Sequence, residues 1–139
     1  MATQSAPRLV RKPFAVPPPR RQTILCIDDS AAILAMLATV LGGAGYAVVS
    51  CGDANSALEH FMGGEIDLVV LDYDMPTANG VELARLFRRI DPTVPLLMFS
   101  GSVLADSEGA LLDGFVPKGA AGCDSLLKAV QAGLAAPAE

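Results

Sequence analysis

Short apolar runs alternate with helix-forming segments five times along the 139 residues of this chain. The apolar runs have the length and composition of buried β-strands, and they occupy residues 23–27, 46–50, 68–71, 96–99 and 114–116. The helical segments occupy residues 31–41, 53–62, 80–90, 103–112 and 121–134, and the fourth of them is short and poorly patterned. Repeated alternation of strand and helix predicts an α/β fold, in which a parallel sheet has helices on both faces.

The third helical segment has the clearest amphipathic pattern. Residues 80–90 read GVELARLFRRI, which places apolar and basic side chains on different faces of a helix. We expect the apolar side chains of this helix to face the sheet and the arginines to face solvent. The apolar side chains are Val81, Leu83, Leu86, Phe87 and Ile90, and the arginines are Arg85, Arg88 and Arg89.

Charge is divided unevenly between two parts of the chain. Residues 1–22 contain five basic residues, no acidic residue and the run Pro17-Pro18-Pro19, so we expect a flexible basic arm. The remaining residues carry five basic and fifteen acidic side chains, a net charge of −10. A body with this charge repels phosphate backbones and is not expected to bind nucleic acid, although it can hold a cation. We therefore divide the chain into an arm at 1–22, a domain at 23–134 and a tail at 135–139.

Two further features bear on the compartment. No apolar run approaches the roughly 20 residues that a membrane span needs, so we expect no span. The cysteines, Cys26, Cys51 and Cys123, lie too far apart for the usual zinc spacings. Both observations favour a cytoplasmic protein with reduced thiols.

Polar side chains follow four of the predicted strands. Asp28 and Asp29 come after the first strand, Asp72 after the third, Ser100 after the fourth and Lys118 after the fifth. A flavodoxin-like strand order, 2-1-3-4-5, makes these four strands neighbours in one five-stranded sheet. Because the carboxyl ends of parallel strands meet at one edge, we expect the five side chains to share a pocket there.

The chemistry of such a pocket points to phosphate. Three carboxylates repel one another unless a cation neutralises them, and Mg²⁺ binds carboxylates while leaving room for phosphate oxygens. The hydroxyl of Ser100 can bond a phosphoryl oxygen, and Lys118 adds a positive charge. We predict that Asp72 is a nucleophile that forms an aspartyl phosphate. A buried carboxylate–lysine network without turnover is the alternative.

These residues stand in motifs that resemble the two-component response-regulator receiver domain of the chemotaxis-regulator type. The resemblance covers residues 23–134 and depends on four motifs taken together: Asp28-Asp29, the segment LDYDMP at 71–76 with Gly80, FSG at 99–101, and FVPK at 115–118. A stand-alone module of this family takes a phosphoryl group from a histidine kinase or a histidine phosphotransfer protein. It then signals by docking onto another protein.

The resemblance implies a role for each matching residue. Asp72 would be the phosphoacceptor, and Asp28 and Asp29 would hold Mg²⁺ together with Asp72. The main-chain carbonyl of Asp74 would complete the metal site. Two further residues would respond to phosphorylation, Ser100 as the switch hydroxyl and Phe115 as the switch aromatic, whose ring turns inward. Lys118 would bind the phosphate. The downstream target is not specified by the sequence, and we expect a monomer or a weak dimer.

Two departures from the family pattern fall on the signalling face. The family usually has Lys-Pro with a cis peptide bond, whereas this chain has Pro117-Lys118-Gly119. Pro117 is tolerable only if the fifth strand is an edge strand. The segment between Ser100 and Lys118 also looks about one helical turn shorter than usual, so the fourth helix is expected to be stunted.

Two alternative functions remain open at this point. A degenerate receiver that is never phosphorylated would act purely as an interaction module, which the altered lysine loop favours. A phosphatase of the haloacid-dehalogenase type also uses an aspartyl nucleophile within D-x-D, here Asp72 and Asp74, with Ser/Thr, Lys and Mg²⁺. That class places D-x-D after the first strand and its other acids downstream, whereas Asp28 and Asp29 lie upstream.

Overall fold

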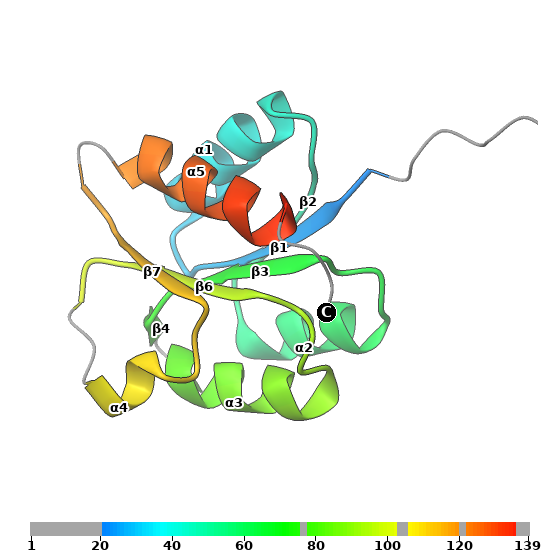
Figure 1. Ribbon diagram of the computed structural model, residues 1–139, viewed down its shortest axis with the longest axis vertical. Helices are drawn as coiled ribbons and strands as arrows, with labels where there is room; N and C mark the ends of the chain where they lie inside the picture. The colour runs from blue at the N-terminus through cyan, green and yellow to red at the C-terminus, as the bar shows by residue number, and fades with distance from the viewer. Residues whose placement is uncertain (1–20, 76–77, 103–105, 120–121, 136–139) are drawn as a thin grey trace, which may run out of the picture.

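The computed structural model describes residues 21–75, 78–102, 106–119 and 122–135. A five-stranded parallel sheet forms its centre, built from β1 (Thr23–Ile27), β2 (Ala47–Cys51), β3 (Leu68–Leu71), β6 (Leu96–Ser100) and β7 (Gly114–Pro117). The strands lie in the order β2-β1-β3-β6-β7 (Figure 1). Counted along the sheet strands alone, this is the predicted flavodoxin-like order, so the fold prediction is confirmed. The arm and tail predictions fall largely on residues 1–20 and 136–139, which lie outside the described residues.

Helices cover both faces of the sheet (Figure 1). The helices α1 (Ala31–Gly43) and α5 (Gly122–Ala135) cover one face, whereas α2 (Ala54–Met62) and α3 (Gly80–Ile90) cover the other together with the short α4 (Asp106–Gly109). Each face has its own apolar cluster, one containing Leu37 and Leu126 and the other Ala57 and Phe87. No helix in the described part of the chain is long and apolar enough to cross a membrane.

Side-chain caps fix where three of the helices begin. Ser30 accepts a hydrogen bond from the Ile33 N–H at the start of α1, and Asp53 accepts one from the Ser56 N–H at the start of α2. Asn79 accepts one from the Val81 N–H at the start of α3. These caps satisfy donors that the first turn leaves free. The Ser30 cap directly follows Asp29, and the Asn79 cap lies between Asp74 and the first turn of α3.

The structure corrects the predicted orientation of three side chains on α3. Leu86 and Ile90 are 40% and 44% exposed, although both were expected to face the sheet. Leu86 lies off the buried stripe of Leu83 and Phe87, and Ile90 is the last residue of the helix. Arg88 was expected to face solvent, but its guanidinium donates hydrogen bonds to the main-chain oxygens of Leu111 and Val94.

A small ribbon absent from the sequence prediction follows the central strand. It consists of β4 (Asp74–Met75) and β5 (Ala78–Asn79), which pair antiparallel. The ribbon links the end of β3 to the start of α3. The predicted bounds of the second strand, residues 46–50, were one residue early. The strand β2 spans Ala47–Cys51.

Candidate functional site

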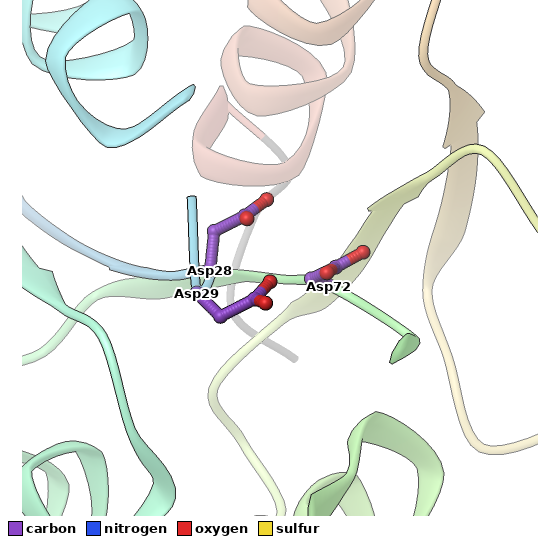
Figure 2. A group of neighbouring side chains, drawn as sticks. All are labelled: Asp28, Asp29 and Asp72. Atoms are coloured by element: carbon purple, nitrogen blue, oxygen red, sulfur yellow. The ribbon is translucent and has the colours of Figure 1, made fainter. Parts of the chain in front are cut away.

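Three carboxylates meet at the carboxyl edge of the sheet. The strands β1 and β3 are paired with Ile27 opposite Leu71, so the residues that follow them emerge side by side. One carboxylate oxygen from each of Asp28, Asp29 and Asp72 lies within 4.8 Å of the others (Figure 2). Asp28 and Asp72 are 2% and 5% exposed, whereas Asp29 is open to solvent. The structure thus brings together the three acids that the sequence placed in one pocket.

Lys118 reaches these carboxylates from the edge strand. Its ammonium lies 2.8 Å from Asp28 Oδ2 and 3.4 Å from Asp72 Oδ1. The main-chain N–H of Lys118 donates to the Ser100 carbonyl at 3.0 Å, which fixes the start of the lysine loop against β6. The ammonium also lies 5.8 Å from the centre of the Phe99 ring, within range of a cation–π contact. In this arrangement the lysine pairs more closely with Asp28 than with Asp72.

The charges of this pocket shift two pKa values. Burial raises the pKa of Asp72, and the nearby charge of Asp28 raises it further, although Lys118 and a hydrogen bond from Ser100 act in the opposite direction. Burial lowers the pKa of Lys118, but its contacts with Asp28 and Asp72 outweigh that effect and leave the pKa above its ordinary value. The lysine therefore stays charged, and Asp72 is the acid that is costly to ionise.

Ser100 and Phe115 occupy different environments. Ser100 is 1% exposed at the end of β6, and its hydroxyl accepts a hydrogen bond from the Ser102 N–H at 3.1 Å. Phe115 lies on β7 opposite Met98 and is 38% exposed. The Ser100 hydroxyl is therefore buried at the carboxyl end of β6, whereas the Phe115 side chain is partly open to solvent. Their roles as a switch pair stay a prediction.

The donor set fits a hard divalent cation. Carboxylate oxygens from three residues converge, and one of the three, Asp29, is exposed, so that water can complete the coordination. The Asp28 carboxylate is itself oriented by the Ser30 N–H, which donates to Oδ1 at 2.9 Å. Such support of a ligand by a neighbouring hydrogen bond is typical of metal sites. Asp74 begins β4 two residues after Asp72, and the metal-binding role of its carbonyl stays a prediction.

Two contacts that the sequence did not suggest tie the Asp72 loop to the segment after β6. The Tyr73 hydroxyl lies 3.4 Å from Glu108 Oε1 in α4, and the Ser102 hydroxyl donates to a carboxylate oxygen of Asp74. Both pairs are far apart in sequence and carry no recognisable pattern. They place Tyr73 and Asp74, which follow Asp72 in the chain, in direct contact with residues between β6 and β7.

The described residues include the lysine loop and part of the fourth helix, where the sequence departs from the family pattern. Pro117 lies in β7, which is an edge strand as expected. The described residues contain no cis peptide bond, so the Lys118–Gly119 bond is trans. Within the described residues α4 spans Asp106–Gly109, and residues 103–105 before it lie outside them, so the expected shortening stays a prediction.

Comparison with known proteins agrees with this geometry. The model of the response regulator receiver domain family matches residues 24–131. The alkaline phosphatase synthesis transcriptional regulatory protein SphR of Synechococcus elongatus is 39% identical over 106 residues, which are 70% of this chain and 40% of SphR. The MtrA regulator of Mycobacterium tuberculosis is 39% identical over 80 residues, or 35% of its length. The chain thus spans two fifths or less of these curated relatives.

Solved structures give the same result. The chemotaxis response regulator CheY4 of Vibrio cholerae is 28% identical with a TM-score of 0.75, over 83% of this chain and 100% of CheY4. TrrA of Thermotoga maritima, in complex with Mg(2+)-BeF, is 28% identical with a TM-score of 0.76, over 81% of this chain and 99% of TrrA. TrrA was also solved with the histidine kinase ThkA. On its family match, its fold and its acidic pocket, the chain belongs to the response regulator receiver domain family.

Proposed function

We propose that this receiver takes a phosphoryl group onto Asp72 from the phosphohistidine of a histidine kinase or of a histidine phosphotransfer protein. The single observation that carries the proposal is the convergence of three carboxylates and one lysine at the same edge of the sheet. The relation to TrrA, which was solved with Mg(2+)-BeF and with a kinase, supports both the metal and the partner class. The protein would act on itself alone, accepting and later losing the phosphoryl group.

Each residue has a defined part in the transfer. A carboxylate oxygen of Asp72 attacks the phosphorus, the P–N bond to the donor imidazole breaks, and its electron pair stays on the imidazole nitrogen. The ammonium of Lys118 lies 3.4 Å from Asp72 Oδ1 and neutralises that carboxylate only partly. The same ammonium would contact the phosphoryl oxygens as negative charge moves onto them. Ser100 would donate its hydroxyl hydrogen to another of these oxygens. Asp28, Asp29, Asp72 and the Asp74 carbonyl would hold Mg²⁺, which supplies the remaining neutralising charge when bound.

A second candidate is an interaction module that is never phosphorylated. The altered lysine loop, Pro117-Lys118-Gly119, and the short α4 of the described residues favour it, because both lie on the face that would report phosphorylation. In either case the output would be docking onto a target protein in the cytoplasm, by a monomer or a weak dimer. The two candidates differ only in whether Asp72 reacts.

Reaction with acetyl phosphate distinguishes the two candidate functions. The wild-type chain is incubated with this donor with and without Mg²⁺, and intact mass is measured. We expect one Mg²⁺-dependent phosphoryl adduct, which is absent from Asp72→Asn and present in Asp53→Asn, a matched change at a helix cap outside the acidic cluster. No adduct at any Mg²⁺ concentration would support the interaction module instead.

A further inference from the structure

Gly80, the first residue of α3, is in contact with the main chain of Asp72. A Cβ atom at position 80 would overlap the main-chain oxygen of Asp72, and it would lie 3.0 Å from both the Asp72 carbonyl carbon and the Tyr73 Cα. All three atoms belong to the peptide unit that follows Asp72. Only glycine can approach another backbone this closely.

The helix is held firmly on its side of this contact. The Gly80 N–H donates a hydrogen bond to the Tyr73 carbonyl at 2.9 Å, and the Asn79 side chain accepts one from the Val81 N–H at 2.7 Å. Behind them the buried side chains of α3 anchor the helix in the core, among them Val81 and Phe87. Moving α3 outward would expose this packing, so the helix cannot easily yield to an added side chain.

The peptide unit after Asp72 lies beyond the strand ladder, because β3 ends at Leu71. The Asp72 N–H is bonded to the Ile27 carbonyl at 3.0 Å, which ties the residue to β1 on its amino side. On its carboxyl side the chain turns away from the sheet toward β4 and rests on Gly80. A methyl group at position 80 would therefore displace this peptide unit and, with it, the Asp72 carboxylate relative to Asp28 and Lys118.

We propose that Gly80 is a positioning residue for the phosphorylation site. Its missing side chain lets the start of α3 hold the Asp72–Tyr73 peptide unit in the position that places the Asp72 carboxylate beside Asp28 and Asp29. The Asp74 carbonyl lies two residues further along the same loop and depends on the same support. The inference rests on the proposed function, because it assigns Gly80 a role at that same site.

The test compares Gly80→Ala with two controls. Gly42→Ala places the same methyl group in α1, where no atom lies within 4 Å, and Phe87→Leu destabilises α3 away from its first turn. Mg²⁺ affinity is measured by titration calorimetry and the melting temperature by circular dichroism. We expect Gly80→Ala to weaken Mg²⁺ binding at least about 10-fold, as loss of support for metal ligands does. Both controls should stay within about 2-fold of wild type, although Phe87→Leu melts earlier.

A second variant keeps the test decisive if Gly80→Ala does not fold. Asn79→Ala removes only the cap that seats the first turn of α3, a loss that helices tolerate. We expect Mg²⁺ binding to weaken by more than 2-fold in this variant but less than in Gly80→Ala, because the cap is only one of the contacts that hold the first turn of α3. Mg²⁺ affinity within 2-fold of wild type in the folded Gly80→Ala protein, or in Asn79→Ala when Gly80→Ala is unfolded, would overturn the proposal. The phosphoryl adduct that acetyl phosphate forms on the wild-type protein is measured in a separate experiment. Failure of the positioning role of Gly80 can then be distinguished from failure of the proposed function.

Discussion

Asp72→Asn is expected to stabilise the protein in metal-free buffer at neutral pH. The repulsion between Asp72 and Asp28, at up to 4.8 Å, is at least about 3.5 kcal/mol for an effective dielectric constant of about 20. Lys118, 3.4 Å away, attracts Asp72 by about 5 kcal/mol on the same scale, but it is one-quarter exposed and shared with Asp28. The attraction exceeds this lower bound on the repulsion by about 1.5 kcal/mol, and the exposure of Lys118 and its sharing with Asp28 reduce that difference. The cost of burying the charge then decides the sign, and we expect a net gain of about 1–2 kcal/mol on removing it.

The pH dependence of this gain follows from the raised pKa of Asp72. A carboxyl whose pKa is raised by folding stabilises the folded state below its unfolded pKa, near 3.9, and loses that contribution as pH rises through the folded pKa. The wild-type protein therefore carries the cost at pH 7, whereas asparagine, which does not titrate, never does. The advantage of Asp72→Asn should be full at pH 7 and should vanish near pH 4.

Thermal unfolding in EDTA measures the effect directly. For a domain of this size we expect the melting temperature of Asp72→Asn to rise by about 4–8 °C at pH 7. Asp53→Asn is the control, because it removes a carboxylate outside the cluster while asparagine still caps α2. Added Mg²⁺ should raise the melting temperature of wild type more than that of Asp72→Asn. A melting temperature of Asp72→Asn at or below wild type in EDTA would refute the electrostatic reasoning.

Three further changes test other parts of the structure. Lys118→Met should tighten Mg²⁺ binding several-fold in calorimetry, because a competing cation is gone, yet slow phosphoryl uptake; weaker Mg²⁺ binding would contradict this. Burial raises the pKa of Cys26 to about 12, so iodoacetamide at pH 8 should modify the half-buried Cys123 first in a peptide map, and early modification of Cys26 would contradict the burial. Arg88→Ala loses its ion pair with Asp113 and its main-chain acceptors; we expect about 2 kcal/mol lower stability in urea unfolding, and an unchanged midpoint would count against the contact.

The layers of the fold were predictable because each strand and helix carries its own local signal. The buried run at Leu68–Leu71 and the turn residues around it define β3 without reference to any other element. Parallel order then places Asp28 and Asp72 at one edge, since Ile27 and Leu71 are register partners. The acidic pocket could therefore be inferred from strand ends alone.

Contacts between distant segments were not predictable in this way. Arg88 was expected in solvent because arginine on a helix face is usually exposed, but acceptors from the chain after α4 surround it. Gly80 was predicted only as the start of a helix and as part of a family motif, and only the three-dimensional approach of α3 to Asp72 shows why a side chain does not fit. Both depend on how loops pack, for which the sequence has no periodic signal.

The most direct test of the central claim is to locate the phosphoryl group by residue. The chain is treated with acetyl phosphate and Mg²⁺, the acyl phosphate is reduced with borohydride, and peptides are analysed by mass spectrometry. An aspartyl phosphate becomes homoserine under these conditions, and we predict this product at Asp72 and at no other acid of the pocket. Homoserine at Asp28 or Asp29 instead, or none in a folded protein shown to bind Mg²⁺, would contradict the assignment of Asp72 as the phosphoacceptor.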